Sequence, residues 1–396
     1  MLVLFTTQPA AGHFHPQVPL ARALTVAGHE VAFACAPAYC AMIEASGFRC
    51  FPAGLDWIEA EAERAFPGLL TVPEGREQAA YFMTRVFAGE AARRMVPDLL
   101  ALARGWPPDV IAHDPVEYGG PVAADLLGLP YAAAGAPVFP PPALLDALVG
   151  VPLAALRERH GLPPAPDPAW LSRYLVLAAM APSLLLPWRD VVPPTTHFLR
   201  PVPFDRTGDE GLPSWVAHLP ARPTVYATLG TINNRQPALF RAILDALGDV
   251  AANLVVTVGR TLDPAQFGPQ RPGVHVARYI PQSALLPRCD LVITHGGVNT
   301  VLGALAQGLP LVVIPLGADQ FTNAERARHA GVGWVVGPDE RTPEAIRAAV
   351  LAVLADPAYR RNAARLRDEL AALPGPEHGV ALLERLARER APIGAR

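Results

Sequence analysis

The sequence predicts an α/β protein with two domains, each built as a doubly wound parallel sheet. Short apolar runs of strand length alternate with longer segments of helical periodicity, an order typical of parallel sheets covered by helices. The alternation occurs in two series, and residues 201–223 between them are rich in proline and glycine without a sustained period. With 396 residues, 51% of them hydrophobic, the chain can fill two cores.

The first series contains three predicted strands with helical stretches after them. The strands are at 2–7, 31–35 and 110–113, and the helices are at 18–27, 77–104 and 116–127. Residues 137–168 are crowded with proline and apolar side chains, which predicts an irregular segment or a packed surface loop.

The second series contains five predicted strands, at 224–229, 253–258, 274–279, 291–294 and 311–314. A last helical pattern covers 379–390. From these patterns we expect one domain at 1–205, a linker at 206–222, a second domain at 223–376 and a terminal helical segment at 377–396.

Composition excludes several classes of protein. The net charge of −3, with 17% charged residues, provides no basic stripe, so no nucleic-acid partner is expected. All 33 basic residues are arginine, and without lysine the chain cannot form a Walker A loop or a pyridoxal Schiff base. There is no G-x-G-x-x-G after the first strand, as a nicotinamide or flavin enzyme would need, and no G-x-S-x-G for an α/β-hydrolase.

The four cysteines, Cys35, Cys40, Cys50 and Cys289, form no C-x-x-C pair and lie among apolar residues. We therefore expect buried thiols rather than disulfides or zinc ligands, and a cytoplasmic protein. The first residues have no basic n-region and read as a strand, not as a signal peptide. No apolar stretch reaches about 18 residues, so no integral membrane segment is expected.

An anion site is predicted where an apolar strand ends in the turn His295, Gly296 and Gly297 and a helix begins. The glycines let backbone approach a ligand closely, and the free N–H groups and dipole of the helix favour a phosphate. Asn299 and Thr300 add polar side chains there. The next strand leads to Asp319 and Gln320, which suit sugar hydroxyls at the same sheet edge.

This segment resembles the nucleotide-sugar signature of the family-one glycosyltransferases, whose pattern runs through HxGxNT, a proline-ended strand and DQxxNA. In look it is closest to bacterial transferases of macrolide and polyketide type. The resemblance implies a GT-B fold, with two Rossmann-like domains facing across a cleft, an acceptor-binding domain at 1–205 and a donor-binding domain at 223–376. It also implies a UDP- or dTDP-linked sugar as co-substrate. The implied diphosphate ligands are His295, Gly297, Asn299 and Thr300, and the implied sugar ligands are Asp319 and Gln320.

Two further motifs support the resemblance. Tyr279, Ile280 and Gln282 match the element that holds the base, with tyrosine in place of the usual tryptophan, and Gly230 with Thr231 matches a turn beside the phosphates. The sequence departs from the family at Gly303, where many members carry a glutamate that binds the ribose hydroxyls.

A catalytic dyad is predicted from two strand ends. His13 follows the first strand, at the edge where α/β sites form, and a neutral imidazole can take a proton from an attacking hydroxyl. Asp114 ends another strand and could bind the far ring nitrogen, whereas Asp109 precedes that strand and should emerge at the opposite edge. The resemblance implies the same two roles, as base and as its partner.

The expected reaction is an inverting displacement that moves a hexose or deoxyhexose to a hydroxyl of a small lipophilic acceptor. Apolar residues at 66–70, 81–87 and 138–148 could line the acceptor pocket or simply fill a core. No metal is expected, because the chain has no Asp-x-Asp pair to clamp a diphosphate-bound cation. A GT-B sugar-nucleotide epimerase and a non-catalytic, donor-binding auxiliary protein remain the alternatives, and the sequence indicates no oligomeric state.

Overall fold

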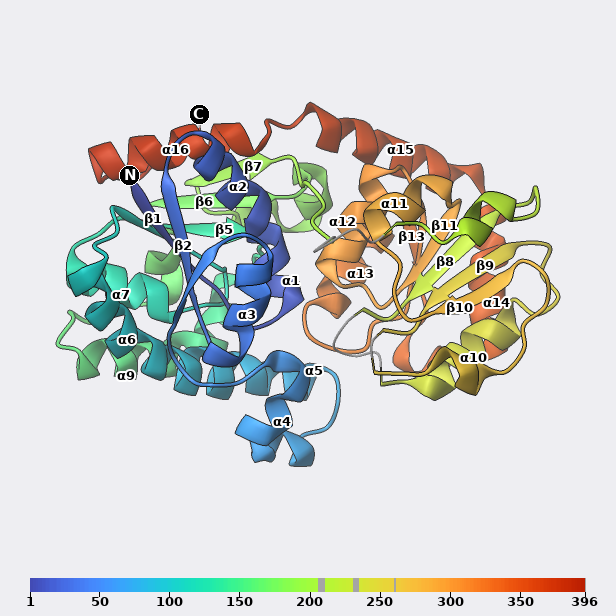
Figure 1. Ribbon diagram of the computed structural model, residues 1–396, viewed down its shortest axis with the longest axis horizontal. Helices are drawn as coiled ribbons and strands as arrows, with labels where there is room; N and C mark the ends of the chain where they lie inside the picture. Colours follow the sequence, from blue (N-terminus) through green and yellow to red (C-terminus); the bar gives the residue numbers. More distant parts are fainter. Residues whose placement is uncertain (206–210, 231–234, 260, 396) are drawn as a thin grey trace. The chain divides into compact units, whose positions relative to one another are not determined.

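The computed structural model describes the chain except for residues 206–210, 231–234, 260 and 396. It divides into two compact units, each with its own parallel sheet (Figure 1). Unit 1 contains residues 1–180, 186–202 and 373–396, and unit 2 contains residues 181–185 and 203–372. Two Rossmann-like parallel sheets covered by helices confirm the predicted fold class.

Unit 1 has a seven-stranded sheet in the order β3-β2-β1-β4-β5-β6-β7, parallel throughout. Its strands are β1 (Leu2–Thr6), β2 (Glu30–Cys35), β3 (Arg49–Pro52), β4 (Val110–His113), β5 (Tyr131–Gly135), β6 (Leu175–Ala179) and β7 (Thr196–Leu199). Its helices are α1 (Ala11–Phe14), α2 (Val18–Val26), α3 (Pro37–Ala45), α4 (Ala62–Ala65), α5 (Arg76–Tyr81), α6 (Ala92–Gly105), α7 (Gly119–Leu127), α8 (Pro142–Leu145), α9 (Val151–Arg159) and α16 (Pro376–Glu389).

Unit 2 has a six-stranded parallel sheet in the order β10-β9-β8-β11-β12-β13. Its strands are β8 (Thr224–Thr228), β9 (Asn253–Thr257), β10 (Val274–Ala277), β11 (Leu291–Thr294), β12 (Leu311–Val313) and β13 (Gly333–Val335). Its helices are α10 (Pro237–Ala246), α11 (Gln282–Leu285), α12 (Val298–Ala306), α13 (Gln320–His329), α14 (Pro343–Ala355) and α15 (Pro357–Ala372).

Both sheets are buried on two faces, which explains why their strands are nearly continuous apolar runs. In unit 2, residues of β8, β9 and β11 such as Val225, Leu254 and Ile293 are completely buried against α10 and α14. In unit 1 the terminal helix α16 packs on α2, and Gly379 lies against Leu20 and Leu199 (Figure 1).

The expected irregular segment at 137–168 is largely helical, which corrects that prediction. It forms α8, a π-helical turn η5 (Asp146–Gly150) and α9. Pro142 stands at the first position of α8, where a missing N–H costs nothing, so it starts a helix rather than breaks one. Pro152 is the second residue of α9, which continues directly from η5. The predicted helix at 77–104 is a helical run whose centre, η4 (Phe82–Ala91), is π-helical.

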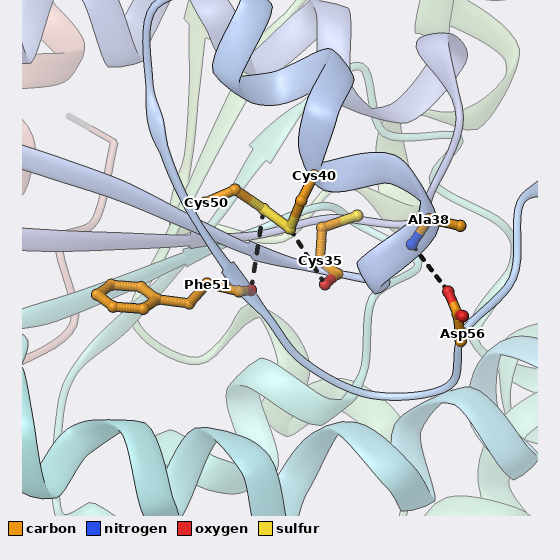
Figure 2. The surroundings of a disulfide bond; sticks show 6 residues. All are labelled: Cys35, Ala38, Cys40, Cys50, Phe51 and Asp56. Carbon is orange, nitrogen blue, oxygen red and sulfur yellow. Dashed lines mark hydrogen bonds between the residues drawn. A yellow bond between two sulfur atoms is a disulfide. The ribbon is translucent and has the colours of Figure 1, made fainter.

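The expectation of four unpaired thiols is wrong, because Cys40 and Cys50 form a disulfide with their Cα atoms 5.4 Å apart (Figure 2). Cys40 lies in α3 and Cys50 in β3, the strand that this helix leads into. A helix that folds back beside its next strand brings two residues ten positions apart into bonding distance. Cys35 and Cys289 are free and buried, as expected. Among the described residues, no helix is both long and apolar enough to cross a membrane.

Candidate active site

In unit 1, the structure brings His13 and Asp114 together. His13 lies in α1 directly after β1, and Asp114 follows β4, the neighbouring strand. The Nδ1 atom of His13 is 2.8 Å from Oδ2 of Asp114. The Asp114 backbone N–H donates to the Thr6 carbonyl, and its Oδ1 accepts from the N–H of Val116, so the carboxyl group is held in place.

Two other polar residues of the β4 segment, Asp109 and His113, make different contacts. Asp109 accepts a hydrogen bond from the Leu2 N–H, at the opposite edge of the sheet. His113 is buried, and its Nδ1 bonds the Asp114 carbonyl rather than the carboxylate. Burial lowers the pKa of His113, which keeps this ring neutral.

A carboxylate that sequence reasoning missed contacts the other nitrogen of His13. Oε2 of Glu59 lies 3.2 Å from Nε2 of His13. Burial alone would lower the pKa of His13, but the charges and hydrogen bonds of Asp114 and Glu59 outweigh burial and hold that pKa well above 6.5. Both carboxylates therefore favour the protonated imidazole, in which one ring N–H faces each carboxylate.

A cluster of aromatic side chains contacts this histidine through one of its members, Phe87. The ring of Phe87, in the π-helical segment η4, meets the His13 ring edge to face at 5.7 Å between centroids. Phe87 also packs near Phe82 and Trp57, and Trp57 packs against Phe66. Within the predicted stretch 81–87, Phe87 thus lies beside the candidate base, and Phe66 of the stretch 66–70 is joined to it through Trp57.

In unit 2, the ring of His295 is packed between two glycines at the carboxyl edge of the sheet. A Cβ on Gly230 or on Gly297 would lie 2.6 Å or 2.5 Å from Nε2 of His295. Any side chain at either position would therefore displace the ring. Burial lowers the pKa of His295 to about 4, so this imidazole is neutral at physiological pH.

The turn after β11 fits closely against the start of α13. Gly296 adopts a φ of +92°, and a Cβ there would come within 3.1 Å of the Gln320 carbonyl oxygen. Asn323 Nδ2 donates both to the Gly296 carbonyl and to Oδ2 of Asp319. Oε1 of Gln320 accepts the N–H groups of Leu316 and Gly317, so the amide is oriented by the loop.

The predicted base-binding and diphosphate-binding residues also meet in unit 2. Gln282 Nε2 donates to Oγ1 of Thr300, the third residue of α12. Ile280 is buried, whereas Tyr279 is exposed and its hydroxyl donates to the backbone carbonyl of Asp205. The carboxylate of Asp205 in turn accepts the N–H and the hydroxyl of Ser283 in α11.

The remaining predicted residues lie at or near α12. Gly297 is its N-cap residue, and Asn299 is exposed at its first turn. Gly303 lies one turn further, where a Cβ would meet Leu286 Cδ1 at 3.3 Å. Thr231 falls outside the described residues. Within the described part of the chain, no group of three His, Cys, Asp or Glu residues could hold a metal ion.

Comparisons with known proteins identify the class. The structure resembles that of the glycosyltransferase SnogD from Streptomyces nogalater, with a TM-score of 0.78 and 29% identity over 98% of this chain and 99% of that one. It also resembles the Streptomyces sp. SF2575 glycosyltransferase SsfS6 complexed with thymidine diphosphate, with a TM-score of 0.76 and 28% identity over 97% and 99%. The fold is thus that of the GT-B glycosyltransferases, and the chain is a glycosyltransferase.

Sequence comparison gives the family. Residues 22–138 and 241–386 match the N-terminal and C-terminal domains of the erythromycin biosynthesis protein CIII-like family, to which this chain belongs. It is 31% identical to an aclacinomycin-T 2-deoxy-L-fucose transferase of Streptomyces galilaeus over 100% of this chain and 98% of that protein. It is 33% identical to an L-demethylnoviosyl transferase of Streptomyces niveus over 98% of both.

Proposed function

We propose that this enzyme moves a hexose or deoxyhexose, with inversion, from a dTDP- or UDP-linked donor to a hydroxyl of a small lipophilic acceptor. His13 is the base and Asp114 its partner. The observation that carries the proposal is the 2.8 Å contact between Nδ1 of His13 and Asp114, next to a cluster of aromatic rings. That contact fixes one tautomer and leaves Nε2 as the nitrogen that receives a proton.

The reaction has one proton transfer and one displacement. Nε2 of His13 takes the proton of the acceptor hydroxyl as the oxygen attacks the anomeric carbon. The bond from that carbon to the diphosphate oxygen breaks, and the leaving nucleotide diphosphate keeps the electron pair. Asp114 stabilises the imidazolium that forms, in the manner of a catalytic dyad.

The donor side of the proposal rests on unit 2. The neutral ring of His295 and the N–H groups at the start of α12 are polar groups oriented before the reaction, and they would stabilise charge that develops on the leaving diphosphate. Asp319 and Gln320 would bind sugar hydroxyls, and Tyr279 would stack on the base. Gly303 offers no carboxylate to the ribose hydroxyls of a nucleotide, and a structural relative is complexed with thymidine diphosphate. Both observations support a donor whose nucleoside contains deoxyribose, such as a dTDP-linked sugar.

The aromatic rings near His13 support a flat or lipophilic acceptor. Trp57, Phe66 and Phe87 are almost fully buried, and a planar apolar molecule next to them would lose its contact with water at the point where its hydroxyl reaches the base.

Release of nucleotide diphosphate tests the function. The enzyme is incubated with a dTDP-hexose, with and without a panel of hydroxyl-bearing aromatic and macrolide aglycones. Diphosphate released in step with a new glycoside, and only when an acceptor is present, supports the proposal. Conversion of the donor without acceptor would indicate an epimerase. Donor binding without turnover would indicate an auxiliary protein.

A further inference from the structure

The carboxylate of Glu59 occupies the side of His13 where the acceptor hydroxyl has to bind. Its Oε2 atom lies 3.2 Å from Nε2, the nitrogen left for the acceptor once Asp114 holds Nδ1. The Glu59 side chain is only 13% exposed, and among the described residues Oε2 makes no hydrogen bond apart from this contact. A buried carboxylate oxygen with a single partner depends strongly on that partner.

The position of Glu59 is fixed by the fold of unit 1. Glu59 begins a short 3-10 helix, η2 (Glu59–Glu61), and its backbone N–H donates to the carbonyl of Pro9. Pro9 belongs to the loop from β1 to α1, which also leads to His13. Trp57, two residues before Glu59, is buried near Phe87, whose ring touches His13. Base and carboxylate are thus anchored to the same loop.

We propose that Glu59 is a positioning residue of the transfer reaction, which holds the Nε2 proton of the protonated His13 ring in the resting enzyme and yields that nitrogen to the acceptor hydroxyl once the proton has passed to solvent. The inference rests on the proposed role of His13 as the base. After displacement the new ether oxygen is a weak acceptor, and the N–H of Nε2 returns to Glu59. The resting state therefore resembles the state that follows proton transfer.

Two opposite effects on rate follow. The groups that face the His13 ring are Asp114 at Nδ1, Glu59 at Nε2 and the uncharged ring of Phe87. A carboxylate at Nε2 stabilises the imidazolium, which makes His13 a stronger base when neutral. The same carboxylate also makes neutral His13 scarcer as the pH falls. Glu59 therefore favours the reaction at high pH and hinders it at low pH.

The test is the pH profile of kcat/KM for wild type and Glu59→Gln, which keeps the size of the side chain and removes its charge. Loss of one carboxylate at this distance should lower the pKa of His13 by about one unit, so the acid limb of the variant should move about one pH unit lower. The plateau at high pH should fall by about threefold, because the base is weaker. Below the wild-type limb the variant should be the faster enzyme, so the two profiles should cross.

Matched variants separate charge from structure. Glu59→Asp restores a carboxylate and should move the limb back toward wild type. Glu61→Gln removes the same charge from the same short helix, where Glu61 pairs with the exposed Arg64, and should leave the profile unchanged. A Glu59→Gln profile that is lower at every pH with an unmoved limb would overturn the proposal, because it would indicate a structural role alone.

A second measurement does not depend on turnover. The imidazole of His13 is titrated by NMR in wild type and Glu59→Gln, with its signals assigned by their absence in His13→Gln. A lower His13 pKa in the Glu59 variant supports the proposal, and an unchanged one refutes it. If His13→Ala remained fully active, the function of His13 as base would fail, while the NMR result would still report whether Glu59 controls the ring.

Discussion

At the scale of single residues, the proposed reaction depends on where the protons of His13 lie. Asp114 holds Nδ1 of His13. Without the Asp114 carboxylate the imidazole can adopt the wrong tautomer, whereas without His13 the enzyme has no base at all. His13→Ala should therefore lower kcat by about 10²-fold or more, and Asp114→Asn should lower it less. Donor affinity should hardly change in either variant, because both residues lie in unit 1.

Steady-state kinetics with a poorly acidic acceptor alcohol, together with calorimetric titration of the nucleotide diphosphate, check this expectation. A phenolic acceptor serves as the control, because it ionises without help and should lose less rate. Wild-type turnover of the alcohol by His13→Ala would contradict the assignment.

For His295 we expect donor binding that does not depend on the charge of the imidazole. Because burial holds its pKa near 4, the ring is neutral on both sides of pH 6.5, where an ordinary histidine would titrate. His295→Gln keeps a donor of similar reach, so the ratio of its dissociation constant for thymidine diphosphate to that of wild type should be constant from about pH 5.5 to 8. A ratio that falls tenfold over this range would show that binding uses an imidazolium.

The sequence predicted the site residues that follow strands but not Glu59. His13, Asp114, His295 and Asp319 can be placed because parallel strands deliver their carboxyl ends to one edge. Glu59 follows the short strand β3 by several residues and begins a helix of three residues, so neither periodicity nor a strand end indicates its position. Tertiary contacts, among them the hydrogen bond from its N–H to the Pro9 carbonyl, bring it to the base.

At the scale of elements, strand composition explains which strands were predicted. Strands β8, β9 and β11 are rich in the β-branched residues valine, isoleucine and threonine, which favour extended backbone. The strand β5, with the sequence YAAAG, and the three-residue β13 lack such a signal and are defined by pairing with their neighbours. The disulfide was missed for a related reason, because its geometry depends on α3 packing beside β3.

The short helix α11 gives a prediction at this scale. The Asp205 carboxylate binds Ser283 in the first turn of α11, and the Asp205 backbone carbonyl accepts a hydrogen bond from the Tyr279 hydroxyl. The ring of Tyr279 is therefore held by a residue that precedes the strands of the unit 2 sheet. A tryptophan, usual in the resembled family, has no hydroxyl for this contact. Tyr279→Phe removes one exposed hydrogen bond, worth about 0.5 to 1.5 kcal/mol, and should raise the donor KM by about two- to tenfold. The acceptor KM should be unchanged.

Initial-rate measurements with each substrate varied in turn check the Tyr279 prediction. Tyr359→Phe is the matched control, since it removes a tyrosine hydroxyl from α15, where the side chain packs on the core of the same unit. A Tyr279→Phe enzyme with wild-type donor KM would show that the hydroxyl does not orient the ring.

At the scale of the whole molecule, each unit supplies a different kind of chemistry. Unit 1 holds the acidic groups around the proposed base His13, and the turns of unit 2 would present neutral donors and backbone N–H groups to a diphosphate. We expect the enzyme to work without a divalent cation, because the described residues contain no cluster that could hold one and the chain has no Asp-x-Asp pair. The helix start and His295 would then carry the neutralising role that a metal has in other transferases.

Exhaustive EDTA treatment followed by assay with and without added magnesium checks this. Retention of at least half of the activity, with no gain on adding magnesium, is the expected result. His295→Ala should respond differently. Having lost one donor to the leaving group, it should be slowed by about 10²-fold. Magnesium that binds together with the nucleotide diphosphate should then restore part of the rate. Complete loss of wild-type activity in EDTA, recovered by magnesium alone, would contradict metal independence and would mean that a cation, not the dipole of α12, balances the charge of the leaving diphosphate.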